Sequence, residues 1–176
     1  SRLNQIDEIE VAELACYGCE TDPEIHTTPW KVFPNKPRND APEYAQYLAN
    51  PSNTFGEQTF NYVLLKFQPD IVMDIRDWWM FEYQQRSPFR DFFHWAIMPT
   101  VDAMPQNPQW VNTFQSADAV FAYSEFGRDT MMQQCDNLNF CEIASPAASQ
   151  TFSPFINKKQ HKKAMGLDPD SIIVGT

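Results

Sequence analysis

Carboxylate, guanidinium and hydroxyl groups gather in the stretch from Phe67 to Asp102, close to two short apolar runs. The runs are Ile71–Ile75 and Phe92–Met98, and their length and composition are typical of buried parallel strands. Several residues that follow or interrupt these runs could bind a substrate or take part in catalysis: Arg76, Asp77, Trp78, His94, Thr100 and Asp102. Open parallel sheets bind their ligands beyond the carboxyl ends of the strands. The stretch therefore predicts the core and rim of a substrate cleft.

Asp102 is the strongest catalytic candidate in this stretch. It lies between Pro99 and Pro105, which stiffen the backbone beyond the second apolar run. A carboxylate held there can bind substrate hydroxyls through charge-assisted hydrogen bonds or assist a developing charge. The structural alternative, with equal weight, is that Asp102 only caps a turn.

The candidate substrate-binding residues have structural interpretations as well. Arg76 and Asp77 lie just after the first run, where Arg76 could instead form a structural ion pair with Asp74. Trp78 could stack on a substrate ring, but packing into the core is the stronger interpretation for a tryptophan there. His94 lies inside the second run, where a hydrogen-bonded core histidine is favoured.

Strand and helix patterns alternate along the chain that must position these residues. Apolar runs predict strands at Ile9–Ala15, Trp30–Phe33, Ile71–Ile75, Phe93–Met98, Ala119–Tyr123, Asn139–Ile143 and Ile172–Val174. Helical spacing predicts helices at Phe55–Phe67, Pro108–Gln115, Phe126–Cys135 and Lys158–Met165. Thr54 is the expected N-cap of the first helix. Ser124 precedes the third, as a cap or as part of a phosphate site.

This alternation predicts an α/β fold with a Rossmann-like, mostly parallel sheet and helices on both faces. The strands Ile71–Ile75 and Phe93–Met98 are expected at its centre.

Composition limits the class of protein. With 176 residues, 43% hydrophobic and 14% aromatic, the chain is expected to fold as a globular domain. A formal charge of −10 argues against a nucleic-acid partner. The chain lacks an apolar run of about 18 residues and a leader-like segment, which predicts a cytoplasmic protein without a membrane span.

Four cysteines suggest two further kinds of site. Cys16 and Cys19 have the C-x-x-C spacing of a redox pair or half a zinc site, while Cys135 and Cys141 are too loosely spaced to complete a convincing one. We favour reduced thiols, and expect no disulfide and no metal at Cys16 and Cys19. The glycine-rich phosphate loops, the G-x-S-x-G motif and paired histidines are missing, so several common enzyme classes are unsupported.

Five segments occur in the order found in one enzyme family. They read PDIVMDIRDWWM, FHWAIMPTVDAMP, ADAVFAYSEFGRDTM, PAASQTFSPF and KKAMGLDPDSIIVGT. Together they resemble the amino-terminal half of a GT-B glycosyltransferase of the retaining family 4, also called group 1. The resemblance covers roughly residues 60–176 well and residues 1–59 poorly. In the fourth segment Ala147, Ala148 and Ser149 replace the family's Gly-Val-Asp.

The resemblance implies transfer of a sugar from a nucleotide-sugar donor to an acceptor, with retention and without a metal or cofactor. Residues 1–156 would be the acceptor-side domain, lacking its first strand. Residues 157–176 would be a linker helix and the first strand of a carboxyl-terminal, donor-binding domain. The implied partners are a sugar or glycan acceptor and that donor-binding domain, and the chain alone is expected to be inactive.

The residues expected at the cleft rim form a surface that we call the lip. It comprises Arg76–Trp79, Pro99–Met104 and Ser124–Phe126. Because the lip is rich in aromatic residues, we expect it to self-associate when it is exposed. Two other functions stay open: a non-catalytic carbohydrate- or partner-binding module, and a C-x-x-C redox protein.

Overall fold

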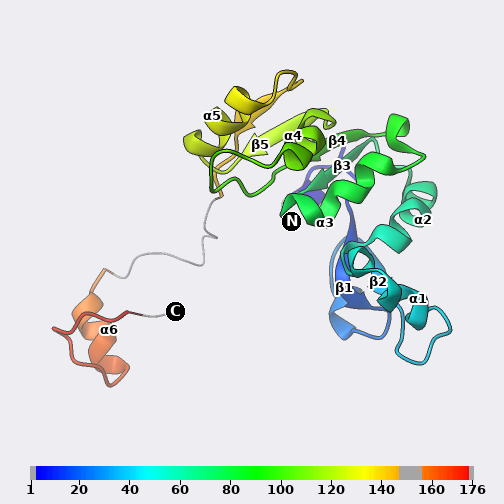
Figure 1. The fold of residues 1–176 in the computed structure, drawn as a ribbon. Coiled ribbons are helices and arrows are strands. Elements are labelled where there is room, and N and C mark those ends of the chain that lie inside the picture. The colour runs from blue at the N-terminus through cyan, green and yellow to red at the C-terminus, as the bar shows by residue number, and fades with distance from the viewer. Residues whose placement is uncertain (1–2, 147–155, 175–176) are drawn as a thin grey trace. The chain divides into compact units, whose positions relative to one another are not determined.

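The strands that the structure describes run parallel within two separate sheets (Figure 1). The computed structural model describes residues 3–146 and 156–174. The small sheet pairs β1 (Ala12–Cys19) with β2 (Lys31–Lys36). The larger sheet has the order β3–β4–β5–β6, so each strand lies beside the next one in the chain. Its strands are β3 (Ile71–Asp74), β4 (His94–Ile97), β5 (Ala119–Ala122) and β6 (Cys141–Ile143).

Helices connect these parallel strands, which confirms the predicted α/β, Rossmann-like fold. The α-helices of this part of the chain are α1 (Tyr44–Ala49), α2 (Glu57–Phe67), α3 (Trp78–Phe81), α4 (Pro108–Gln115) and α5 (Glu125–Gln134). The predicted helix at Pro108–Gln115 is confirmed to the residue, with the Asn107 side chain accepting a hydrogen bond from the Gln109 amide at its start. Short 3₁₀ turns at Pro51–Phe55, Glu82–Arg86 and Arg90–Phe92 lie between the longer elements.

The core lies against one face of the larger sheet. Residues in register in a parallel pair point to the same face, so Val72 and Trp95 share a face, as do Asp74 and Ile97. Trp95 and Ile97 are fully buried, and they form one cluster with apolar side chains from α2 to α5. On β3 the alternate residues point the other way, and these side chains are exposed.

Two predictions about the first sheet strand and the first helix are wrong in detail. The strand at Ile71–Ile75 is an edge of the described sheet, because among the described residues only β4 pairs with it. Thr54 lies inside the 3₁₀ turn Pro51–Phe55, and Gly56, at φ 110°, precedes α2 in its place. Only glycine adopts this left-handed geometry easily, so the chain turns into α2 without a side-chain cap.

The second strand also differs from its prediction. β2 continues through Pro34, which lies in register with Ala15 of β1. A proline is tolerated in an edge strand because its missing N–H can face away from the neighbouring strand.

The chain divides into two compact units, Ser1–Ser145 and Pro146–Thr176. The described part of the second unit contains α6 (Lys158–Ala164), whose N-cap Asn157 accepts a hydrogen bond from the Gln160 amide. Gly166, at φ 73°, follows the helix, where a glycine adopts this left-handed conformation easily. The predicted strand at Ile172–Val174 is wrong, since these residues are not part of any described strand.

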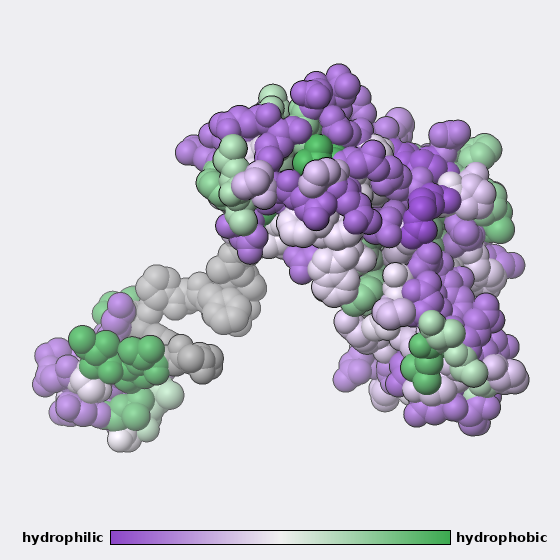
Figure 2. All heavy atoms as spheres, viewed as in Figure 1, coloured by the Kyte–Doolittle hydropathy of each residue, from purple (hydrophilic) through white to green (hydrophobic). Residues whose placement is uncertain are grey.

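The described part of the second unit exposes apolar side chains. Figure 2 shows a hydrophobic area there, and Ile172 and Val174 are 92% and 87% exposed. In the part of the chain that the structure describes, no helix combines the length and apolar content needed to cross a bilayer.

Candidate functional site

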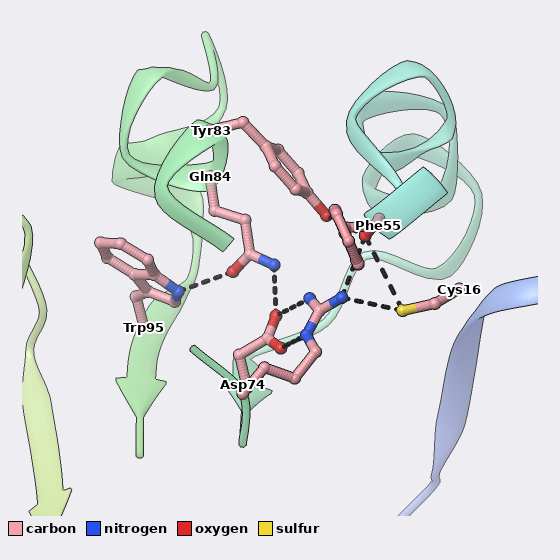
Figure 3. A network of polar contacts seen from close by, with 7 residues as sticks. Cys16, Phe55, Asp74, Tyr83, Gln84 and Trp95 are labelled. Carbon is pink, nitrogen blue, oxygen red and sulfur yellow. Dashed lines mark hydrogen bonds and ion pairs between the residues drawn. The ribbon is translucent and has the colours of Figure 1, made fainter. Parts of the chain in front are cut away.

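Asp74 ends β3 at the carboxyl edge of the sheet and anchors a buried polar network (Figure 3). The Arg76 side chain folds back onto the Asp74 carboxylate, with Nε donating to Oδ1 and Nη2 donating to Oδ2 at 2.6 Å. Gln84 Nε2 donates to the same Oδ2 at 2.5 Å. The other end of the Gln84 amide accepts from the indole Nε1 of Trp95 at 2.7 Å. The network thus joins the end of β3 to the middle of β4.

Arg76 also connects β3 to the small sheet. Its Nη1 donates to Cys16 Sγ, in β1, at 2.8 Å and to the backbone oxygen of Phe55 at 3.1 Å. Tyr83 Oη donates to the same Phe55 oxygen at 2.8 Å. One guanidinium group therefore ties together three segments that are far apart in the sequence.

Burial and charge shift the ionisation of this network. Burial alone would lower the pKa of Arg76, but the hydrogen bonds and negative charge of Asp74 outweigh it and raise the pKa above its ordinary value. Burial raises the pKa of the Tyr83 hydroxyl to about 12. Arg76 is therefore a fixed cation at any physiological pH, and Tyr83 a fixed hydrogen-bond donor.

The geometry indicates that Arg76 has a structural role. Four of its N–H hydrogen bonds go to protein atoms, and its side chain is only 20% exposed. The structural ion pair that the sequence suggested for Asp74 is confirmed. A guanidinium with its donors used in this way is poorly placed to bind a substrate directly.

The other rim residues lie on connections that leave the carboxyl edge. Asp77 is the N-cap residue of α3, without a side-chain capping bond, and Trp78 packs in α3 with its ring 5.5 Å from that of Trp110. Thr100 and Asp102 follow β4 and are exposed. Neither of these two side chains makes a hydrogen bond or ion pair with any residue that the structure describes.

Ser124 lies at the same edge, after β5. Its hydroxyl accepts a hydrogen bond from the Gly127 amide at 3.2 Å, which is the predicted helix cap. Gly127 is buried, and a β-carbon built there would lie 3.6 Å from Val101 Cβ. The start of α5 therefore packs against the residue next to Asp102, which brings the connections after β4 and β5 together.

His94 does not join this group. It is the first residue of β4, so it lies at the amino edge of the sheet, at the opposite end from Asp102 and Ser124. There it lines an open cavity of about 510 Å³ together with Asp70, Arg90, Phe92, Ser116 and Asp118, among others. The cavity contains an ion pair in which Arg90 Nη2 is 2.9 Å from Asp118 Oδ2. The sequence offered two interpretations of His94, a cleft residue and, with more weight, a hydrogen-bonded core histidine. Its exposed side chain contradicts the second, and its position at the amino edge separates it from the predicted cleft, because the two ends of the second apolar run lie at opposite edges of the sheet.

The four cysteines are free thiols. Cys16 and Cys19 both lie in β1, which extends four residues past the predicted strand end at Ala15. Burial raises the pKa of Cys16, although Arg76 acts against it, whereas a hydrogen bond from Thr21 lowers the pKa of Cys19. The register of β1 with β2 shifts between Ala15 and Cys19, and the two thiols have different surroundings.

Comparison with known proteins adds no family assignment: no family model matches the chain, and neither curated proteins nor solved structures show a significant match. Among the described residues, no group of three or more histidine, cysteine, aspartate or glutamate side chains could hold a metal ion. The function must therefore be argued from the geometry of the carboxyl edge.

Several residues of the network escaped sequence reasoning. Gln84 and Tyr83 lie in the 3₁₀ turn Glu82–Arg86, whose residues show no recognisable spacing in the sequence. Trp95 offered a partial signal, because a tryptophan in an apolar strand needs a buried partner for its indole N–H. Cys16 was considered only for its spacing to Cys19, and its contact with Arg76 spans sixty positions of sequence.

Proposed function

We propose that this chain is the acceptor-side half of a retaining glycosyltransferase, which transfers a sugar from a nucleotide-sugar to a hydroxyl-bearing acceptor. The proposal joins the sequence resemblance to one structural observation. Three consecutive connections at the carboxyl edge present Asp77, Thr100, Asp102 and Ser124, over a sheet with a Rossmann-like order. Ligands of open α/β sheets bind at this edge.

The absence of a described partner for the Asp102 side chain supports this proposal. Its carboxylate is exposed and has no partner among the described residues, while the Asp74 carboxylate at the end of β3 is buried and hydrogen-bonded. A free carboxylate beside the amino terminus of α5 can accept hydrogen bonds from substrate hydroxyl groups. Asp102 is therefore the candidate catalytic residue, with Asp77, Thr100 and Ser124 as candidate substrate-binding residues.

Aromatic side chains around the same edge fit a sugar-binding surface. Trp79 is 45% exposed and meets Phe55 edge-to-face, with ring centroids 4.9 Å apart. Phe126, at the start of α5, is 51% exposed. Exposed aromatic faces can stack on sugar rings, and the same exposure would favour self-association of the lip.

The alternative is a non-catalytic module that binds carbohydrate or protein at this edge. The same exposed aromatic groups would serve it, without any requirement for Asp102. The redox alternative has less support at Cys16, because burial raises the pKa of this thiol, whereas a redox-active cysteine needs a lowered one; of the pair, only Cys19 has a lowered pKa, through its hydrogen bond from Thr21.

The test uses the full-length polypeptide that contains this chain, assayed with radiolabelled nucleotide-sugars and a panel of glycan acceptors. Asp102→Ala should lower kcat/KM for the acceptor by about ten- to a hundredfold, equivalent to about 1.5–3 kcal/mol. Its melting temperature should stay unchanged, because the side chain has no described partner.

Asp91→Ala is the matched control. Asp91 is also exposed, but it lies at the amino edge of the sheet, in the turn Arg90–Phe92. The control should retain full activity. Equal kcat/KM values for both variants would remove Asp102 from the site, and no transfer with any donor would favour the binding module.

A further inference from the structure

A cavity of about 250 Å³ opens at the carboxyl ends of β1 and β2, and we call it the small-sheet cavity. Three elements of the first unit contribute to its walls. Glu20 directly follows β1, Lys36 ends β2, and Gln58 and Thr59 lie in the first turn of α2. None of the lip residues lines this cavity, so it is separate from the candidate site described above.

Asn35, in β2, is a buried polar residue of the cavity wall and is only 4% exposed. Its Nδ2 group donates hydrogen bonds to the backbone oxygens of Asn53 at 2.6 Å, Cys16 at 2.9 Å and Thr54 at 3.2 Å. These acceptors fix the orientation of the amide, because an amide oxygen in the place of Nδ2 would face three other oxygens. The other end of the amide, Oδ1, is buried and has no hydrogen-bond partner among the described residues.

Oδ1 lies on the cavity side of the Asn35 amide. None of the three residues that accept hydrogen bonds from Nδ2 lines the cavity, and the two ends of an amide group point in different directions. A buried acceptor without a donor destabilises the folded state, and such groups in native proteins call for an explanation. The small-sheet cavity therefore offers a hydrogen-bond acceptor to a small ligand that carries a donor.

Positive groups also line the cavity. α2 is eleven residues long, and its N-cap residue, Gly56, has no side chain to accept hydrogen bonds from the amides of the first turn. These amides form the positive end of the helix dipole, which favours an anionic group. Lys36 makes no ion pair with a described residue, whereas Arg38 lies 3.7 Å from Asp40. A carboxylate or a phosphate group would be stabilised beside Lys36 and the start of α2.

Two carboxylates in the same cavity decide between these anions. Glu20 and Glu43 are exposed, and neither side chain makes a hydrogen bond or ion pair with any residue that the structure describes. Both would repel a phosphate dianion. A ligand with one carboxylate and one ammonium group avoids this repulsion, because its ammonium can pair with the glutamates. An ammonium donates three hydrogen bonds, and the cavity offers three acceptor groups, which are Asn35 Oδ1 and the two glutamate carboxylates.

We propose that the small-sheet cavity binds a free α-amino acid in its zwitterionic form. The carboxylate pairs with Lys36 and the first turn of α2, while the ammonium donates to Asn35 Oδ1 and pairs with Glu20 and Glu43. Both charged groups of an α-amino acid are attached to one carbon atom, so they can reach the two sets of partners within a small cavity. This inference goes beyond the proposed sugar transfer and does not depend on it.

The test titrates the isotope-labelled chain with each of the standard amino acids and follows its NMR spectrum. At least one amino acid should shift the side-chain amide signals of Asn35 and the backbone amide signals of Gln58 and Thr59, with one Kd for all three residues. The N-acetyl derivative and the carboxamide derivative of that amino acid each lack one charge. Each should bind at least about tenfold more weakly than the parent amino acid, because a charge-assisted hydrogen bond is lost. Inorganic phosphate should also bind more weakly than the parent.

Two substitutions test the two charged ends of the cavity separately. Lys36→Met should weaken amino-acid binding by about tenfold or more, and Glu20→Gln by about threefold or more, because a second glutamate remains. Lys31→Met, at the other end of β2, and Glu24→Gln make the same changes outside the cavity and should leave the Kd unchanged. All four variants should keep the wild-type fold, as measured by melting temperature. If Lys36→Met fails to fold, Glu20→Gln and its control carry the test.

Four results would overturn the proposal. One is the absence of saturable shifts with every amino acid. Another is equal binding of the parent amino acid and its two derivatives, which would mean that its charges are not recognised. The third is tighter binding of inorganic phosphate, which would make the cavity an anion site. The fourth is an unchanged Kd in the folded cavity variants, which would place the ligand elsewhere on the chain.

Discussion

Two arginine–aspartate pairs lie at opposite ends of the same sheet and differ in their surroundings. At the carboxyl edge, Arg76 and Asp74 have side chains only 20% and 9% exposed, and Gln84, Cys16 and Phe55 complete their hydrogen bonds. At the amino edge, Arg90 pairs with Asp118, whose side chain is 41% exposed. The first pair is part of the core, while the second borders an open cavity.

Trp95 connects the two pairs. Its indole donates to Gln84 in the buried network, and its backbone amide donates to Asp118 Oδ2 at 2.7 Å. The Arg90 guanidinium also lies 5.4 Å from the Trp95 ring centroid. Trp95 therefore contributes to a buried site at one edge of the sheet and to a solvent-exposed site at the other. The contribution of an ion pair to the free energy of unfolding differs between a buried site and an exposed one.

The largest effect expected from this comparison follows removal of Arg76. Arg76→Ala leaves the buried Asp74 carboxylate without its cation, which should cost about 3–5 kcal/mol in the free energy of unfolding. Urea denaturation measures the loss. Arg86→Ala, which removes an arginine 56% exposed beside Glu82 and Glu57, should cost under about 1 kcal/mol. Equal losses would mean that the Asp74 pair is no more important than a surface pair.

The next largest effect should come from the indole of Trp95. Trp95→Phe removes the donor to Gln84 Oε1 and leaves a buried acceptor unpaired, at a cost of about 1–3 kcal/mol. The control is Trp30→Phe, whose indole donates to Glu13 Oε2 at 2.9 Å at the surface. Thermal unfolding should show a much larger drop in melting temperature for Trp95→Phe than for Trp30→Phe. Similar drops in both variants would mean that the Gln84 amide does not depend on the indole donor of Trp95.

Alkaline pH should act on the buried end through Tyr83. Its pKa in the folded protein is raised to about 12, above the unfolded value of about 10, because burial favours the neutral hydroxyl. The unfolded chain loses this proton first, so stability is complete below about pH 10 and falls as the pH rises toward 12. Tyr83→Phe should remove this part of the alkaline loss, as measured by urea unfolding between pH 8 and 12. An unchanged alkaline slope would show that Tyr83 is not buried as described.

Acid should act on the exposed end through Asp118, with the smallest effect. Burial acts to raise the pKa of Asp118, but hydrogen bonds from Trp95 and Arg90 outweigh it and lower the pKa. The folded carboxylate therefore holds its charge to lower pH than the unfolded one, and its contribution is present above about pH 4 and lost below it. The stability difference between wild type and Asp118→Asn should shrink as the pH falls from 6 to 2. A difference that persists at pH 2 would contradict this assignment.

Local patterns were sufficient to predict much of the fold. Ser124 caps α5 and Asn107 begins α4 where the sequence places those helices, because caps and helical spacing are set by neighbours in the chain. The strand positions followed from short apolar runs between turn-forming residues. The pairing of β1 with β2 in a separate sheet could not be predicted this way, since it depends on which edges meet in space.

Contacts of the site could be predicted only where the two interacting residues are close neighbours in the sequence. The Asp74–Arg76 pair was expected because opposite charges lie two residues apart in the chain. The links from Arg76 to Cys16 and from Gln84 to Trp95 join distant segments and leave no local signal. His94 was assigned to the wrong end of the sheet because a four-residue strand is short enough for its two ends to look alike in sequence.

The sequential order of the larger sheet has a consequence for how the protein folds. Because β3, β4, β5 and β6 each pair with the next strand in the chain, every pairing closes a loop of modest length. Local pairings of this kind cost less chain entropy before they form, and they are associated with faster folding than distant ones. On the ribosome, β3 and β4 can pair while β5 is still being synthesised, and each later strand can then add to the growing sheet.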